Sequence, residues 1–242
     1  RTVMPESFPD ISGNIERIKA RIRQAAVAAG RDPGKVRLIA VSKYMPVEYL
    51  RRAMQAGQYI FGENTLQDAS VKLAEIPDPR LEWHFIGHLQ SNKARFIPGK
   101  FHWLHTLDSH KLARKLSDAW NDGKQPLQVL LQVNIANDPH KYGLPPDTTQ
   151  QFVEELLQQE LPGIRLRGLM TIGREHATPG ERRQDFIALR RLRDEIAAGL
   201  PPDSFSELSM GMSDDFDIAV AEGATMVRVG SSIFGPRPET PA

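Results

Sequence analysis

A regular alternation of short apolar segments with helix-like segments constrains the fold of this chain more than any other feature. Residues 36–42 form an apolar, β-branched run typical of a buried strand, and Lys43 follows directly. Before this run, isoleucines recur three or four residues apart from Ile11 to Ile22, and Gly30 stands where a helix is expected to end. The pattern predicts an N-terminal amphipathic helix and then a strand that delivers Lys43 to its carboxyl end.

The same alternation continues along the chain. Further strands are predicted at residues 59–64, 83–87, 103–107, 129–133, 166–171, 207–210 and 226–230. Helical spacing fills most of the gaps between them. About eight strands alternating with helices predict a single (β/α)8 barrel of the TIM type, one domain spanning residues 1–242. An open doubly wound sheet is the alternative, but residues 42–46 stand where its glycine-rich nucleotide turn belongs.

Composition excludes several classes of function. Of the 242 residues 40% are hydrophobic and 25% are charged, as in an ordinary globular protein. The net charge of +1 gives no field that would attract nucleic acid or an anionic membrane, so we expect neither as a partner. Without cysteine there is no thiolate nucleophile, disulfide or cysteine-ligated metal. The absence of a long apolar run or a signal-like start predicts a cytoplasmic protein.

No metal site is predicted. His84 and His88 are four residues apart on a predicted strand, where that spacing separates them by about 13 Å, too far for both to bind one ion. His102, His105 and His110 lie around another strand with no carboxylate at ligand spacing, so we expect them to pack or to face solvent.

Polar residues gather where the predicted strands end. They are Lys43, Asn64, His88, Asn134, Thr171, the loop 209–213 and residues 230–232. In barrels of this type the loops after the last two strands often bind phosphate through backbone amides. Here those loops carry Gly211, Ser213, Gly230 and Ser231. A phosphate site and ordinary helix capping by the two serines are equally consistent with this pattern.

Arg228 favours the phosphate interpretation. Strand alternation places Met226, Arg228 and Gly230 on one face and the valines between them on the other, which suits packing against helices. Arg228 should therefore point into the barrel, where an unpaired guanidinium is costly and needs a carboxylate or a ligand atom as acceptor. Lys43 alone is either a solvated residue or a reactive amine. Together these groups suit a phosphorylated carbonyl compound held as an imine, such as pyridoxal 5′-phosphate (PLP).

Several ordered motifs resemble one protein family. The segment Trp-His-Phe-Ile-Gly-His-Leu-Gln-Ser-Asn-Lys at residues 83–93 resembles the signature of the pyridoxal phosphate homeostasis proteins, the YggS/PROSC family. Matching segments follow the family's order at residues 40–43, 61–64, 105–108, 141–143, 167–170, 208–215 and 226–230. The sequence departs from the family at Tyr44-Met45, where Thr-Lys is common, and at Thr65, where tyrosine is common.

The resemblance implies a single barrel similar to the barrel domain of alanine racemase, with PLP bound as a Schiff base to Lys43. It further implies that Ser213 and the backbone at Gly230 and Ser231 hold the phosphate, that Arg228 faces the pyridine nitrogen and that Asn64 lies near the ring. An arginine in that position leaves the nitrogen unprotonated and weakens the ring as an electron sink, which argues against transaminase-like chemistry.

Two functions from different classes use the same site. One is a regulatory protein that carries, buffers or delivers PLP without turnover; the other is an amino-acid racemase or decarboxylase. An imine-forming aldolase would need acid–base residues that the sequence does not reveal. Barrel-fold racemases take their second acid–base group from a domain after the barrel, whereas only residues 236–242 follow Gly235 here. We therefore predict a binding protein without catalytic residues, a monomer or weak dimer whose partners are PLP and PLP-dependent apo-enzymes.

Overall fold

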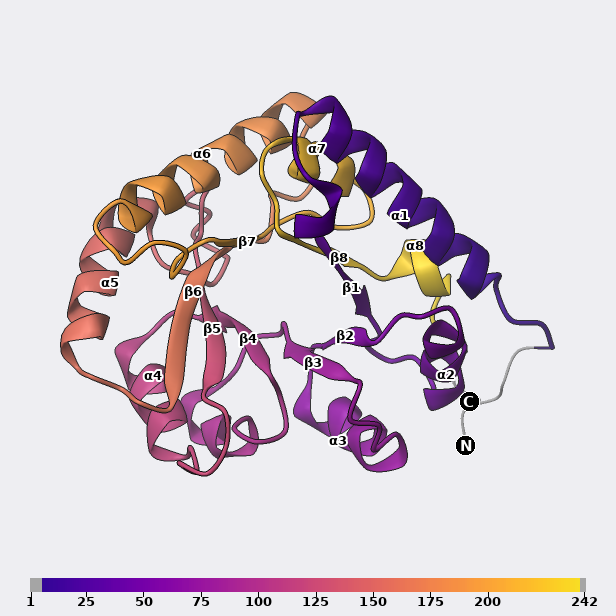
Figure 1. Cartoon of the computed structure of the whole chain (residues 1–242), viewed down its shortest axis with the longest axis horizontal. Coiled ribbons are helices and arrows are strands. Elements are labelled where there is room, and N and C mark those ends of the chain that lie inside the picture. The colour runs from indigo at the N-terminus through magenta and orange to yellow at the C-terminus, as the bar shows by residue number, and fades with distance from the viewer. Residues whose placement is uncertain (1–5, 240–242) are drawn as a thin grey trace.

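Eight parallel strands close into a barrel in the computed structural model, which describes residues 6–239 (Figure 1). Each strand pairs with the next in chain order, and β8 pairs with β1 at Leu38 and Val227, for example. This closure confirms the predicted (β/α)8 barrel and excludes the doubly wound sheet, which would leave two open edges. The ends of the predicted domain, residues 1–5 and 240–242, lie outside the described residues.

The strands fall within a few residues of their predicted positions. They are β1 (Arg37–Val41), β2 (Ile60–Glu63), β3 (Glu82–Phe85), β4 (Trp103–Leu107), β5 (Leu127–Gln132), β6 (Ile164–Met170), β7 (Glu207–Ser209) and β8 (Met226–Val229). The helices are α1 (Ile11–Ala28), α2 (Val47–Gln55), α3 (Leu66–Glu75), α4 (His110–Asp118), α5 (Thr149–Gln158), α6 (Pro179–Ala197), α7 (Phe216–Ala221) and α8 (Ser231–Phe234). Between β3 and β4 the connection is a 3₁₀ turn, Ser91–Phe96, in place of an α-helix.

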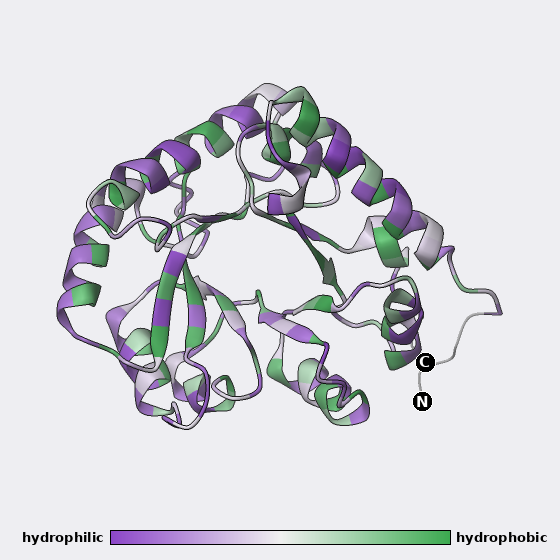
Figure 2. Cartoon of the chain, in the orientation of Figure 1, coloured by the Kyte–Doolittle hydropathy of each residue, from purple (hydrophilic) through white to green (hydrophobic). Residues whose placement is uncertain are grey.

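The predicted N-terminal helix α1 lies outside the barrel, where it packs against α2, α7 and α8 (Figure 1). Asp10 caps it by accepting a hydrogen bond from the Gly13 N–H. Its isoleucines at positions 11, 15, 18 and 22 are all buried, so the periodicity seen in the sequence is the face that covers the barrel. The helices show both hydrophobic and hydrophilic residues along their length (Figure 2). None of the helices in residues 6–239 has the length and hydropathy needed to cross a membrane.

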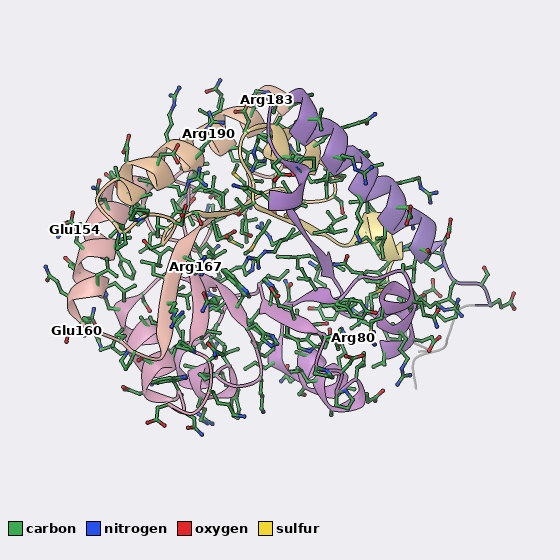
Figure 3. All side chains as sticks on the ribbon, in the orientation of Figure 1. Arg80, Glu154, Glu160, Arg167, Arg183 and Arg190 are labelled. Carbon is green, nitrogen blue, oxygen red and sulfur yellow. The ribbon has the colours of Figure 1, made fainter. Side chains whose placement is uncertain are left out.

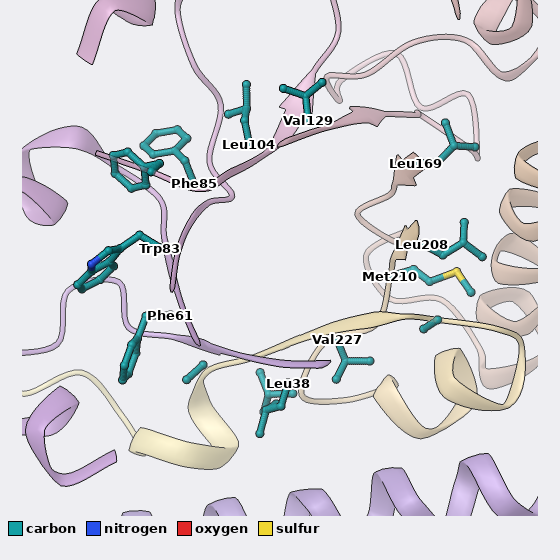
Figure 4. Packing of buried hydrophobic residues seen from close by; sticks show 14 of the residues in the cluster. Leu38, Phe61, Trp83, Phe85, Leu104, Val129, Leu169, Leu208, Met210 and Val227 are labelled. Atoms are coloured by element: carbon teal, nitrogen blue, oxygen red, sulfur yellow. The ribbon is translucent and has the colours of Figure 1, made fainter. Parts of the chain in front are cut away.

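The apolar core has two layers. The larger one fills the space between strands and helices and includes Phe61, Trp83 and Val227, whose side chains point away from the barrel axis (Figure 4). A smaller cluster inside the barrel contains Ile39, Trp103, Leu130, Met170 and Met226. The two layers follow strand alternation. Met226 therefore faces inward and Val227 outward, as the sequence predicts.

Charged side chains occupy the outside of the helical layer. Figure 3 shows Glu154, Glu160 and Arg183 there, at the periphery of the molecule. On α6, the guanidinium groups of Arg183 and Arg190 both bind the Glu222 carboxylate, at 2.7 and 3.0 Å. These ion pairs connect α6 to the residue that follows α7.

Gly168 pairs with Glu207 where β6 and β7 approach closely. A methyl group there would lie 2.0 Å from the backbone oxygen of Glu207. We expect Gly168→Ala to lower the free energy of unfolding by about 1–3 kcal/mol, as overpacking does. Gly123→Ala is the matched control, since its added carbon would meet no atom nearer than 3.5 Å. Equal urea-unfolding midpoints for the two variants would contradict this account.

Candidate functional site

A pocket of about 450 Å³ lies at the carboxyl ends of the strands. Its wall brings together all of the residues that the sequence predicts for the site: Lys43, Asn64, Ser213, Arg228, Gly230 and Ser231. Val41, Ile86 and Met170 supply apolar surface beside them. The structure thus places the candidates around one space, while the role of each remains a prediction.

Three other polar residues at the strand ends have different partners. His88 stacks on Tyr142 with 3.7 Å between ring centroids. Asn134 holds its own loop by donating to the backbone oxygen of Asp138 at 2.7 Å. Thr171 donates its hydroxyl to the backbone oxygen of Val133 at 2.8 Å. These side chains stabilise the rim of the barrel and do not line the pocket.

Lys43 reaches the pocket because it continues the inward face of β1 two residues beyond the strand's end. Ile39 belongs to the apolar cluster inside the barrel and Val41 lines the pocket, so alternation carries Lys43 to the same side. The chain then turns sharply at Tyr44, whose φ of 61° lies in the left-handed region. Lys43 itself is exposed. Its amine is therefore open to a ligand that enters from solvent.

A buried group of charges holds the backbone before Lys43. We call Ser42, Glu63, Asp68 and Lys72 the Lys72 cluster. The Lys72 ammonium donates to the backbone oxygen of Ser42 at 2.5 Å and to Glu63 Oε1 at 2.7 Å. The Ser42 hydroxyl donates to the same Glu63 oxygen at 2.6 Å. The hydroxyl and the backbone oxygen of Ser42 are thus held by side chains from β2 and α3, respectively.

The Lys72 cluster also holds the residue after Lys43. Asp68 Oδ2 accepts from Lys72 at 2.9 Å and from the backbone N–H of Tyr44 at 2.6 Å. Lys43 therefore has an exposed side chain on a backbone that is held on both sides. The sequence alone does not reveal this cluster. The i,i+4 spacing of Asp68 and Lys72 was the one local signal, and that spacing usually marks a solvated helix face.

Glu63 is a buried carboxyl group with a raised pKa. Its side chain is fully buried, and Oε2 has no hydrogen-bond partner among the described residues. Burial raises the pKa of Glu63 to about 7, although Lys72 and Ser42 pull the pKa in the opposite direction. We therefore expect the net charge of the Lys72 cluster to change near neutral pH.

Arg228 points inward from β8 and is buried. The predicted acceptor was a carboxylate or a ligand atom, but Nη1 donates to the Ser209 hydroxyl at 2.6 Å and Nη2 to the backbone oxygen of Thr171 at 3.0 Å. Arg228 forms no ion pair within residues 6–239. Desolvation lowers the pKa of Arg228 to about 10, against the opposing effect of Asp215. The pocket therefore contains a permanent cation at neutral pH.

The loops after β7 and β8 form the side of the pocket suited to an anion. Asp215 fixes the first loop by accepting from the Met212 N–H at 2.8 Å and from Arg182 at 2.9 Å. At the second, α8 begins with Ser231. The N–H groups of Ile233 and Phe234 both donate to the Gly230 oxygen, whereas those of Ser231 and Ser232 have no backbone partner among the described residues. A side-chain carbon at Gly230 would lie 3.2 Å from the Val41 oxygen, so glycine permits close approach of β8 and β1.

These donors fit a phosphorylated aldehyde such as PLP. Ser213 and Ser231 offer hydroxyl groups, Arg228 offers charge and Lys43 offers an amine. Asn64 Oδ1 is buried without a hydrogen-bond partner in the described part of the chain, and a bound polar group would satisfy it. No cluster of His, Asp and Glu side chains suited to a metal ion occurs in residues 6–239.

Comparison with known proteins agrees with the fold. Residues 13–238 match the family described as alanine racemase, N-terminal domain. An alanine racemase from Corynebacterium glutamicum superimposes with a TM-score of 0.67 at 21% identity, covering 94% of this chain and 61% of that one. The fold and the family match thus define a barrel of the alanine racemase type, with Lys43 lining the pocket at the carboxyl ends of the strands.

Proteins with higher sequence identity to this chain show which family within the alanine racemase type it belongs to. The Pseudomonas aeruginosa protein named pyridoxal phosphate homeostasis protein is 46% identical over 94% of this chain and 96% of its own length. The Escherichia coli K12 protein of the same name is 40% identical over 94% and 97%. The structure of PipY from Synechococcus elongatus with PLP bound has a TM-score of 0.82 at 37% identity, covering 93% of this chain and all of that one. This chain belongs to the pyridoxal phosphate homeostasis protein family.

Breaking the Lys72 cluster should destabilise the fold. We expect Lys72→Met to lower the free energy of unfolding by about 3–5 kcal/mol at about pH 8, because it leaves Glu63 buried without its cation. Adding Glu63→Gln should restore part of the loss. Lys111→Met, which removes an exposed lysine, is the control and should have little effect. A Lys72 variant as stable as this control in urea would contradict the role assigned to the cluster.

Glu63 should also make stability depend on pH. Its pKa of about 7 in the folded protein exceeds the ordinary value of 4.5, so the folded state binds the proton more tightly than the unfolded state. The resulting stabilisation is fully present below about pH 4.5 and is lost as the pH rises through 7. Relative to Glu63→Gln, the wild type should therefore lose stability between about pH 5 and about pH 8. Unfolding titrations at both pH values measure this, and a constant difference would show that the pKa is not raised.

Proposed function

We propose that this protein binds PLP through Lys43 and holds it for other proteins, with no turnover of its own. The observation that carries the proposal is the meeting of an exposed lysine, a buried arginine and two serine-bearing loops around one pocket of about 450 Å³. Relatives named for pyridoxal phosphate homeostasis, at up to 46% identity, support it, as does a related structure solved with PLP.

Each residue has a distinct part in the proposal. When bound, PLP supplies an aldehyde that reacts with amines and a ring that withdraws electrons. Lys43 provides the amine that anchors it. Ser213 and the backbone at Gly230 and Ser231 bind the phosphate, while Asn64 lies near the ring. Arg228 donates to the ring nitrogen.

Arg228 is the reason to favour holding over conversion. Its pKa of about 10 keeps its proton in place at neutral pH, so it can donate a hydrogen bond but does not protonate the nitrogen. An unprotonated nitrogen makes a weak electron sink. The same pocket therefore retains the cofactor but gives little help to carbanion chemistry on an amino acid.

The proposal also covers the protein's partners, its location in the cell and its oligomeric state. We propose that PLP-dependent apo-enzymes receive the cofactor in the cytoplasm, since an exposed anchor lysine allows direct exchange with solvent or with a docked protein. Nucleic acid and membranes are not partners in this proposal, in line with a net charge of +1. The working unit is a single barrel, residues 1–242, as a monomer or weak dimer.

The anchor is tested by the visible absorption of the purified protein mixed with PLP. We expect a yellow band that is absent in Lys43→Ala and retained in Lys111→Ala, an exposed lysine outside the pocket. Borohydride reduction followed by mass spectrometry should locate the cofactor on Lys43. A wild-type protein that takes up no PLP would overturn the proposal. Steady racemisation or decarboxylation of amino acids by the loaded protein would instead support an enzyme.

A further inference from the structure

An unbroken series of hydrogen bonds crosses the inside of the barrel beneath the pocket. Arg228 Nη1 donates to Ser209 Oγ at 2.6 Å, and Ser209 Oγ lies 2.8 Å from His105 Nδ1. His105 Nε2 lies 2.7 Å from His84 Nδ1, and His84 Nε2 lies 2.7 Å from Glu82 Oε1. We call these five residues the interior chain. They come from β8, β7, β4 and β3, each from an inward position of its strand.

The interior chain occupies space that such barrels normally fill with branched apolar side chains. Ser209, His105 and His84 are each 0% exposed and Arg228 is 4% exposed. Burying polar groups costs free energy unless every one of them is satisfied. Here Ser209, His105 and His84 each have a partner on both sides, and His84 is also stacked on Trp103, with 4° between the ring planes. A complete polar network at this depth indicates a function connected with the one member that lines the pocket, Arg228.

The two ends of the chain fix the direction of every hydrogen bond in it. The Glu82 carboxylate can only accept, so His84 must carry its proton on Nε2. A neutral His84 then accepts at Nδ1, which places the His105 proton on Nε2. His105 in turn accepts at Nδ1 from the Ser209 hydroxyl. Ser209 is left to accept from Arg228, which can only donate.

Electrostatics agrees with this arrangement. Burial lowers the pKa of both His84 and His105, so both rings are neutral at pH 7. The hydrogen bond from His84 lowers the pKa of Glu82, which is therefore ionised, and Arg37 binds the same carboxylate at 3.3 Å. A charged His105 would stand beside Arg228 and repel it.

We propose that Ser209, His105 and His84 are positioning residues that hold the Arg228 guanidinium in one orientation as a donor to the ligand in the pocket. Arginine has five N–H groups. Two of them, on Nη1 and Nη2, are committed to Ser209 and Thr171, which fixes the plane of the group. The remaining donors are then presented in a fixed direction. The identity of that ligand rests on the proposed function, whereas the direction of the chain does not.

The first test needs no cofactor. Nitrogen-15 NMR of the histidine rings in the full chain distinguishes the two neutral tautomers from the charged ring. We expect His84 and His105 both to be neutral and protonated on Nε2 at pH 7. An Nδ1–H tautomer or a charged ring at either position would overturn the proposed direction of the chain, whether or not the protein binds PLP.

The second test compares His105→Leu with His105→Gln. Leucine interrupts the chain, whereas a glutamine oxygen can accept from Ser209 and its amide group can donate to His84. We expect His105→Leu and Ser209→Ala to weaken PLP binding about ten- to a hundredfold and to shift the visible band, because Arg228 loses its fixed orientation. His105→Gln should restore affinity and band position. Unfolding midpoints measured in parallel identify any variant that fails to fold. If a variant fails, the tautomer measurement on the wild-type protein still tests the proposed direction of the interior chain.

The outcomes separate this inference from the proposed function. If the wild type binds no PLP, the proposed function fails and the tautomers alone test the interior chain. If the wild type binds PLP and a folded His105→Leu matches it in affinity and spectrum, the inference is wrong although the function stands. Equal losses in the leucine and glutamine variants would likewise overturn it, since they would show a role in packing alone.

Discussion

Burial of the Arg228 cation inside the barrel is the constraint on which the site depends. A guanidinium without solvent needs acceptors, and β8 offers none of its own at that depth. Ser209 and the Thr171 carbonyl supply them from the ends of the two preceding strands. Closure of the barrel is what brings these strands to the same level. The barrel therefore creates the cost of burying the charge and also provides the groups that offset it.

Lys72 and Lys43 both lie near the end of β1, but the first is buried and fully paired and the second is exposed. Lys72 is buried and holds three oxygen atoms, from Ser42, Glu63 and Asp68. Lys43 stands one residue beyond Ser42 and is exposed. Because Lys72 fixes the backbone, Lys43 needs no contacts of its own to be well placed. Its backbone entropy is lost on folding and not on binding, while its exposed side chain stays free and is ordered only when a ligand binds.

The sequence predicts periodic features well, but it predicts poorly which side chains on different strands contact each other. Alternation in β8 is enough to turn Arg228 inward, and the polar ends of the strands are enough to place Lys43, Ser213 and Ser231 at one rim. One of the two partners of His105 is Ser209, 104 residues away. That contact depends on the stagger between strands, which no local pattern encodes. His105 consequently reads as a packing residue in the sequence and is a link in the interior chain in the structure.

The common direction of the hydrogen bonds in the interior chain limits the chemistry that the pocket can perform. A series of groups that passes protons must be able to reverse, with each member giving and receiving in turn. Here Arg228 only donates and Glu82 only accepts, so every hydrogen bond between them points the same way. Moving a proton to the pocket would require Arg228 to give one up, against a pKa of about 10. The interior chain is therefore suited to orienting a donor and poorly suited to acid–base catalysis, which is the division expected of a protein that holds a reactive cofactor.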